Sequence, residues 1–176
     1  MTPKETKNLV KKAMTRDTDA FTVLMQLHMK NMYRVGLAIL MNDEDVADAI
    51  QDTILACWEN IHTLREPAFF KTWLTRILIN KCYDVLRTAP QTLPLSEAVY
   101  NRPSPERGYN PELKEALSTL DEKYRSVMIL FYSEGYHIAE IASILKLPNS
   151  TVKTRLQRGR EKLAAYYDIS ERRGKK

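Results

Sequence analysis

A cluster of prolines near the middle of this chain constrains its fold more than any other feature. Five of the eight prolines lie between residues 89 and 112. Proline lacks the backbone N–H that a helix interior needs, so this stretch favours an extended, semi-rigid segment. We therefore expect two small domains on either side of a linker. The expected bounds are residues 1–88, a linker at 89–110, a second domain at 111–170 and a basic tail at 171–176.

Outside this cluster the chain has few turn signals, because the rest of it contains only four glycines and three prolines. Apolar residues recur at steps of three and four, which indicates amphipathic helices. The sequence therefore predicts an all-α fold. The expected helices cover residues 21–39, 43–61, 69–87, 111–120, 121–135, 138–145 and a last one, capped by Asn149 or Ser150, that ends near Tyr167. Residues 62–68 are expected to form a short loop.

Several classes of protein are disfavoured by what the sequence lacks. No apolar run approaches the roughly 18 residues that a membrane helix needs, and the first residues lack the apolar core of a secretory signal. Cys57 and Cys82 form no C-x-x-C pair, and no H-E-x-x-H, G-x-S-x-G or G-x-x-x-x-G-K motif occurs. We expect a cytoplasmic protein that is not an enzyme and has no metal site and no cofactor.

Charge is distributed unevenly along the chain. Residues 146–176 hold ten Lys and Arg against three Asp and Glu, whereas residues 1–145 hold 17 against 19. Residues 35–64 contain no Lys or Arg but six acidic side chains. A basic C-terminal segment is a candidate nucleic-acid footprint, and the acidic segment is expected to face a different partner.

The last two expected helices and their tight turn form a candidate helix-turn-helix. The second helix of such a unit fits the major groove of DNA, where Arg pairs with guanine and other cations contact phosphates. The candidate DNA-binding residues are Ser150, Thr151, Lys153, Thr154, Arg155, Arg158 and Arg160. The alternative is an ordinary helical hairpin with a solvated basic face.

The acidic segment is predicted to carry a stripe on one face of its helix. Asp48, Asp52, Leu55 and Glu59 follow at steps of four, three and four, with Gln51 and Trp58 beside them. Such a stripe favours a basic helical partner over DNA, which it would repel. A solvated acidic face is the alternative, and in either case Trp58 is expected to be partly buried.

The helix expected at 69–87 has a polar side that combines cations with an amide able to read a base edge. Its members are Arg76, Asn80, Tyr83, Asp84 and Arg87. Surface salt bridging is the alternative for the two arginines, and Asp84 is a candidate for orienting one of them. Trp73 and His28 lie at apolar positions and are expected in the core, and a wedge into DNA is the alternative for Trp73.

Motifs in both halves resemble the extracytoplasmic-function (group 4) sigma factors of the sigma-70 family. The first half is similar to sigma region 2 through DVADAIQD at 45–52 and FKTWLTRI at 70–77. The second half is similar to sigma region 4 through LDEKYR at 120–125, YHIAEIA at 136–142 and TVKTRLQRGREKL at 151–163. The sequence departs from the family at Ser150, where glycine is frequent, at Gly159, where alanine is usual, and at Ile79, where a polar residue is frequent.

The resemblance implies a role for each surface. It implies that the acidic stripe docks on the clamp helices of the largest RNA polymerase subunit. The third helix and the loop at 62–68 would bind the locally melted minus-ten element, and the last helix the minus-thirty-five element. The implied protein is an alternative sigma factor that binds core polymerase and promoter DNA in a stress or envelope response, restrained by an anti-sigma factor that is often membrane-anchored.

Two other readings stay open from the sequence. A dimeric helix-turn-helix regulator would bind operators without polymerase, but a palindrome reader needs a self-complementary dimer surface. A protein adaptor would use the acidic helix alone, which leaves the basic last helix without a role.

Overall fold

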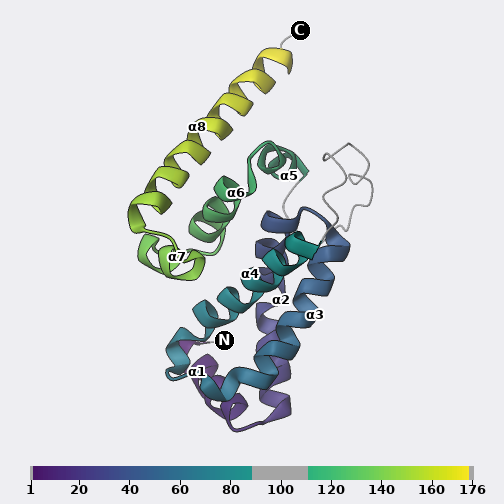
Figure 1. The fold of residues 1–176 in the computed structure, drawn as a ribbon, viewed down its shortest axis with the longest axis vertical. Coiled ribbons are helices and arrows are strands. Elements are labelled where there is room, and N and C mark those ends of the chain that lie inside the picture. Colours follow the sequence, from purple (N-terminus) through teal and green to yellow (C-terminus); the bar gives the residue numbers. More distant parts are fainter. Residues whose placement is uncertain (1, 89–110, 175–176) are drawn as a thin grey trace. The chain divides into compact units, whose positions relative to one another are not determined.

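The computed structural model describes residues 2–88 and 111–174. The chain divides into two compact units, Met1–Pro105 and Glu106–Lys176 (Figure 1). All regular structure in the described ranges is helical, which confirms the all-α prediction. The linker expected at 89–110 lies outside the described residues, so the predicted domain bounds remain predictions. No helix in the described ranges is both long enough and apolar enough to cross a membrane.

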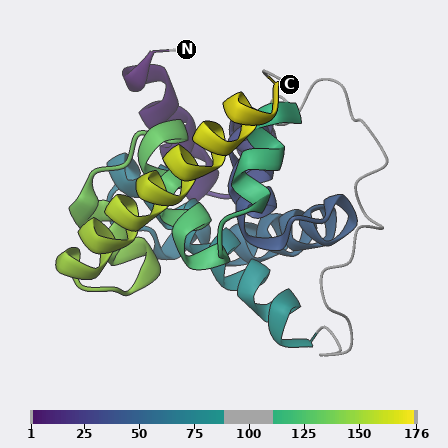
Figure 2. The same cartoon turned by 90° about the horizontal axis from the view of Figure 1, so that it is seen from above.

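In its described residues, the first unit is a bundle of four helices. Its helices are α1 (Pro3–Met14), α2 (Thr18–Leu40), α3 (Asp43–Asn60) and α4 (Phe70–Thr88). The helices α2, α3 and α4 pack against one another, and α1 packs against α2 (Figure 2). The three helices expected from the periodicity are therefore present, each within three residues of its predicted ends.

Local signals explain where these helices begin and end. The Asp17 side chain accepts a hydrogen bond from the backbone N–H of Ala20 at 2.9 Å, which caps α2. The Asn42 side chain accepts from the N–H groups of Glu44 and Asp45, at 2.8 and 3.1 Å, and caps α3. Such caps satisfy N–H groups that have no partner within the helix.

The sequence prediction missed two features of this unit. Helix α1 begins with a capping box, in which the Thr2 N–H donates to Glu5 Oε2 at 2.7 Å and the Glu5 N–H donates to Thr2 Oγ1 at 3.3 Å. The pattern Thr-x-x-Glu is a known start signal and could have revealed this helix. The loop expected at 62–68 instead contains two 3₁₀ turns, η1 (Ile61–Thr63) and η2 (Pro67–Phe69).

The core of the first unit follows the predicted apolar stripes with a few exceptions. Its fully buried side chains include Val10, Leu24, Val46, Leu74 and Leu78. Trp73 was expected in the core but is only half-buried. Both cysteines are buried, and this burial raises the pKa of Cys57 and of Cys82 to about 12.

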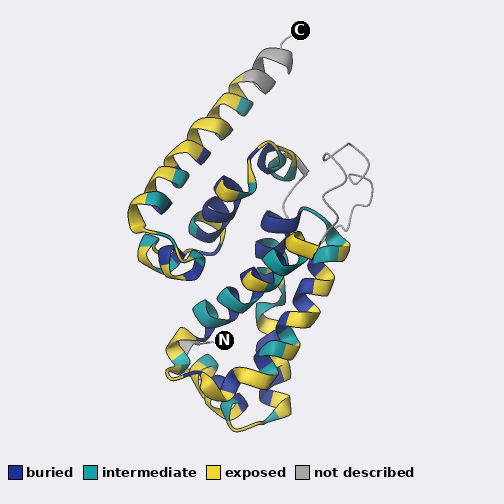
Figure 3. Ribbon diagram, in the orientation of Figure 1, coloured by how far each residue is buried: buried dark blue, intermediate teal, exposed yellow. Residues whose placement is uncertain are grey.

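The second unit contains four helices and one π-helical turn. The helices are α5 (Pro111–Ser118), α6 (Glu122–Met128), α7 (Ile138–Leu145) and α8 (Asn149–Gly174), and the turn is η3 (Ile129–Ser133). Helix α8 packs against α5, α6 and α7. Figure 3 shows that the buried residues of α8 lie on the side that faces these helices.

Three expectations for the second unit require correction. The helix expected at 121–135 changes from α to π geometry at Ile129, and the Glu134 N–H donates to the Ile129 carbonyl at 3.0 Å. Helix α8 continues to Gly174 instead of ending near Tyr167. Asn149 lies inside this helix, since the Val152 N–H donates to the Pro148 carbonyl at 3.1 Å, so neither expected residue occupies the capping position.

Candidate functional site

Helices α7 and α8 form the expected helix-turn-helix. The turn between them begins at Lys146, which adopts a left-handed conformation with φ of 54°. The N–H of Leu147 donates to the Ala142 carbonyl at 2.9 Å, which closes the end of α7. On α8 the buried residues Val152 and Leu156 fix the helix against the unit, so its polar side faces outward.

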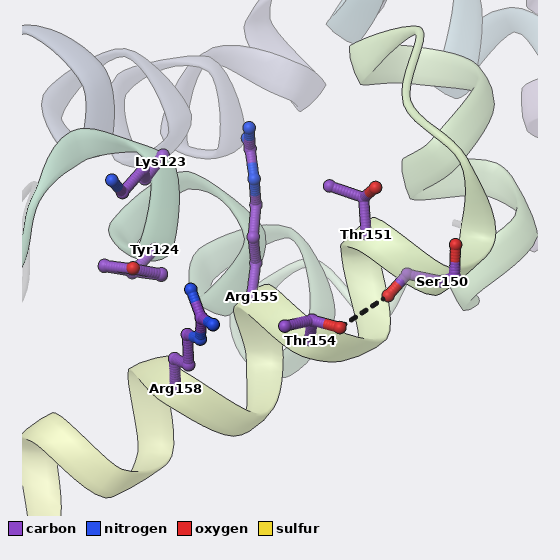
Figure 4. Close-up of a pocket in the computed structure, with 7 residues that line it drawn as sticks. All are labelled: Lys123, Tyr124, Ser150, Thr151, Thr154, Arg155 and Arg158. Atoms are coloured by element: carbon purple, nitrogen blue, oxygen red, sulfur yellow. Dashed lines mark hydrogen bonds between the residues drawn. The ribbon is translucent and has the colours of Figure 1, made fainter.

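One edge of α8 borders an open depression of about 350 Å³ (Figure 4). The depression is lined by Lys123 and Tyr124 of α6 and by Ser150, Thr151, Thr154, Arg155 and Arg158 of α8. Figure 4 shows Arg155 and Arg158 pointing to the side of α8 on which Lys123 and Tyr124 lie. Five of the seven predicted minus-thirty-five residues are thus brought together.

Helix α6 also contributes to this surface, which was not predicted from the sequence. The Lys123 ammonium lies 5.1 Å from the centre of the Tyr124 ring, and the Lys162 ammonium lies 5.7 Å from it. Lys123 and the two arginines line the depression, and Lys162 lies near the Tyr124 ring at its edge. This positive charge suits phosphate groups. Lys123 and Tyr124 lie in the motif at 120–125, but no local signal places them beside α8, because that nearness arises only from the packing of α6 against α8.

The other predicted residues of α8 lie on the opposite edge. At about 100° per residue, Lys153 and Arg160 fall across the helix from Arg155. Arg160 Nη1 donates to the Tyr132 hydroxyl at 3.3 Å, and Tyr132 is 55% exposed. The predicted DNA-binding residues of α8 therefore lie on both sides of its buried stripe, not on a single face.

The acidic stripe on α3 is exposed as predicted. The side chains of Asp48, Gln51, Asp52, Leu55 and Glu59 are all exposed, and Leu55 is 57% exposed. We call these five residues, together with Trp58, the acidic face. Trp58 is half-buried at its edge, with its ring 5.0 Å from Phe21 in an edge-to-face contact.

The start of α3 adds negative charge beside this face. Asp43, Glu44 and Asp45 form the acidic first turn of the helix. Partial burial, followed by the charges of Asp48 and Glu44, raises the pKa of Asp45. Clustered carboxylates of this kind attract a basic partner.

The polar side of α4 presents the third predicted set. Asn80 and Arg87 are exposed, whereas Arg76, Tyr83 and Asp84 are half-buried. Asp84 and Arg87 form an ion pair one turn apart, so Asp84 orients a neighbouring arginine, which was one of its two expected roles. Both side chains remain accessible to solvent, so the pair contributes little to stability.

Aromatic residues around α4 divide between the core and the surface. Trp73 packs on Phe70, with ring centres 6.0 Å apart, and His28 lies 5.5 Å from the same ring. Phe69, directly before α4, is 63% exposed and was not singled out from the sequence. It offers a flat apolar surface beside the polar side of α4.

Metal ligands do not gather in the part of the chain that the structure describes. Within residues 2–88 and 111–174, no group of three or more His, Cys, Asp or Glu side chains is placed to hold a metal ion. The features that stand out are the acidic face and two polar, cation-bearing surfaces.

A helix-turn-helix with a basic recognition helix, together with a second helical unit, defines a DNA-binding transcription protein. Comparison with known families makes this class specific. Residues 24–90 match the family model of sigma-70 region 2, and residues 111–163 match that of sigma-70 region 4. The chain is 34% identical over 154 residues to the ECF RNA polymerase sigma factor SigM of Mycobacterium tuberculosis, covering 84% of this chain and 77% of the relative.

Solved structures agree with these matches. CnrH, solved with the cytosolic domain of CnrY, is 26% identical with a TM-score of 0.69, over 93% of this chain and 97% of CnrH. The sigma factor RpoE of Bartonella quintana, solved with the anti-sigma factor NepR, shares the fold with a TM-score of 0.72 at 22% identity, over 85% and 97% of the two chains. The chain belongs to the ECF RNA polymerase sigma factors. It is an alternative sigma factor that binds RNA polymerase and promoter DNA to start transcription.

Proposed function

We propose that three surfaces of this sigma factor divide the work of promoter-specific initiation. The acidic face on α3 binds core polymerase, the polar side of α4 binds the minus-ten element, and α8 binds the minus-thirty-five element. The observation that carries the proposal is the separation of charge between the two units. Acidic side chains dominate the exposed side of α3, and cations line the depression beside α8.

Docking on polymerase is assigned to the acidic face because its composition suits a protein partner. Leu55 is an exposed apolar side chain among exposed carboxylates. A protein interface combines apolar contact with complementary charge, whereas DNA would be repelled. The proposed partner surface is a basic helical pair in the largest polymerase subunit.

The minus-ten role is assigned to α4 and the segment before it. Asn80 offers donors and an acceptor for a base edge, and Arg87 offers a cation for phosphates. The exposed ring of Phe69 adds a surface on which an unpaired base could stack. These features favour a strand that is being opened over an intact duplex.

The minus-thirty-five role is assigned to the residues around the start of α8. We propose that Arg155 or Arg158 reaches base edges, while Lys123 and Lys162 contact phosphates. Lys153 and Arg160, on the other edge of the helix, would contact the opposite backbone of the groove. An α-helix inserted into the major groove has a DNA backbone on each side, which accommodates cations on both edges.

Control by an anti-sigma factor is proposed by analogy with the relatives. RpoE of Bartonella quintana was solved with an anti-sigma factor. We infer that a comparable inhibitor, which could be membrane-anchored, holds this protein inactive in the cytoplasm until a stress or envelope signal arrives. The protein has no catalytic role of its own in this proposal.

In vitro transcription with purified core polymerase on a genomic fragment library tests the proposal. We expect polymerase-dependent transcripts whose start sites share two spaced upstream elements. A variant with both Arg155→Ala and Arg158→Ala is the matched control, since it should bind polymerase but lose most of these transcripts. A protein that binds palindromic fragments without polymerase, and yields no transcripts with it, would instead be a dimeric operator-binding regulator.

A further inference from the structure

Arg16 occupies a backbone position that favours glycine. It follows the C-terminal end of α1 and has φ of 69°. The Asp17 N–H donates to the Lys12 carbonyl at 3.3 Å, and the Arg16 N–H donates to the Ala13 carbonyl at 3.0 Å. This turn commonly ends a helix with a left-handed glycine, because a side chain is strained there. An arginine at this position is therefore expected to make side-chain contacts that offset the strain.

The side chain reaches the end of α3, more than 40 residues along the chain. Its Nη1 donates to the carbonyl oxygen of Trp58 at 2.7 Å, and its Nη2 donates to that of Glu59 at 3.3 Å. The last carbonyls of a helix have no partner within it and carry partial negative charge. The last turn of α3 contains no basic residue of its own, so Arg16 supplies this cation from another element.

The same guanidinium also contacts the Trp58 ring. Its central carbon lies 5.2 Å from the ring centre, within the range of a cation–π interaction. A second contact, with Phe21 at 5.0 Å, holds the ring edge to face. Trp58 and Glu59 are members of the acidic face, and Leu55 lies one turn before Glu59 on the same side. Arg16 therefore fixes both the backbone and the aromatic side chain at one end of this face.

We propose that Arg16 is a positioning residue for polymerase docking: it holds Trp58 and the end of α3 in the conformation that polymerase binds. A surface ordered before binding loses less conformational entropy on association, which strengthens the complex. The inference rests on the proposed docking role of the acidic face. The turn that follows α1 then contributes to polymerase docking, a role that the surface charges of α1 do not indicate.

The Arg16→Gly variant gives a direct test with the full chain. Glycine suits the left-handed backbone, so this change removes the side chain without adding strain. We expect about tenfold weaker binding to purified core polymerase, as for loss of charged hydrogen bonds, and unchanged helicity by circular dichroism. Arg16→Lys should recover part of the affinity. Lys12→Ala is the matched control, because it removes one exposed cation from the last turn of α1 and should bind normally.

Fluorescence distinguishes positioning from general stabilisation. The chain has two tryptophans, so in a Trp73→Phe background the tryptophan fluorescence comes from Trp58 alone. In that background Arg16→Gly should shift the Trp58 emission and increase its quenching by acrylamide, while Lys12→Ala should not. Wild-type polymerase affinity or unaltered Trp58 fluorescence in Arg16→Gly would overturn the inference. So would a loss of helicity, which would make Arg16 a stabilising residue.

A charge reversal in the acidic face separates this inference from the proposal beneath it. If Asp48→Arg with Asp52→Arg abolishes polymerase binding and Arg16→Gly does not weaken it, the docking role stands and the positioning role of Arg16 is wrong. If neither change affects binding, the docking role is wrong and the inference falls with it.

Discussion

Gly159 of α8 lies so close to Met128 of α6 that the Met128 side chain must shift before any side chain fits at position 159. A Cβ atom at Gly159 would stand 2.9 Å from Met128 Cγ and 3.0 Å from Met128 Sδ. Gly159 is buried, and it follows Val152 and Leu156 on the side of α8 that packs against the unit. The departure from the alanine that is usual in the family therefore coincides with a close approach of two helices.

We expect Gly159→Val to loosen α8 from α6. Overpacking of this kind typically costs about 1–3 kcal/mol. Hydrogen exchange measured on the full chain should show faster exchange in α8 and unchanged exchange in α2. Gly159→Ala should be nearly neutral, because a gain of about 1 kcal/mol in helix propensity offsets the shift of the flexible Met128 side chain. Recovery of protection in Gly159→Val with Met128→Ala would identify the contact, and full protection in Gly159→Val alone would contradict it.

The two arginines beside the depression should control promoter use. A bidentate contact to a base is worth about 1–3 kcal/mol of discrimination, so Arg155→Ala or Arg158→Ala should reduce transcription from a mapped promoter by about tenfold or more. Polymerase binding should stay normal in both variants. Lys7→Ala, an exposed cation on α1, serves as the control for loss of charge. Unchanged transcription in both arginine variants would refute the proposal that Arg155 or Arg158 reads bases.

Reversal of charge in the acidic face should have the opposite effect. Asp48→Arg with Asp52→Arg replaces attraction by repulsion at a complementary interface. We expect the variant to lose core polymerase in co-purification while it still binds minus-thirty-five DNA. Both side chains are exposed, so circular dichroism should show an intact helix. A folded variant that co-purifies with polymerase at wild-type yield would mean that the acidic face is only a solvated surface.

His28 should make the first unit less stable in mild acid. Burial against Phe70, and then the charge of Lys71, lowers the pKa of His28 below 6.5. Below about pH 6.5 the unfolded chain binds a proton at this histidine that the folded chain excludes, so the free energy of unfolding falls as the pH falls. Urea unfolding followed by tryptophan fluorescence should show a lower midpoint at about pH 5.5 than at about pH 7.5.

Two histidine variants separate this effect from general acid sensitivity. His28→Gln should reduce the difference between the two midpoints, because glutamine does not titrate. His62→Gln alters an exposed histidine of the same unit and should leave the difference intact. Equal pH dependence in wild type and His28→Gln would show that other groups are responsible.

The two buried thiols should be unreactive until the first unit opens. With a pKa of about 12 for both Cys57 and Cys82, only about one thiol in ten thousand is ionised near pH 8, and the thiolate is the reactive form. A thiol reagent should label the native protein very slowly and both cysteines rapidly in denaturant. Rapid labelling of one cysteine in the native state would show that its part of the core opens locally.

The sequence by itself determined the elements whose signals are local. Helix α7 was predicted with both of its ends, because its apolar spacing and the turn that follows it lie within a dozen residues. The cap at Asn42 and the exposure of Asp48 and Asp52 also follow from the nearby sequence. The start signal of α1 was present in Thr2 and Glu5, although hydrophobic periodicity alone did not predict this helix. Family motifs then supplied the class of protein.

Only the tertiary structure decided which distant residues meet. Lys123 and Tyr124 join the depression beside α8 because α6 packs there, and Arg16 reaches Trp58 across more than 40 residues. The division of Arg155 and Arg160 between two edges depends on which side of α8 is buried. Hydrophobic periodicity indicates that a helix buries one face. It does not indicate which neighbouring helix covers that face or which residues lie beside it. Packing fixes those contacts, because close-packed side chains accept few arrangements.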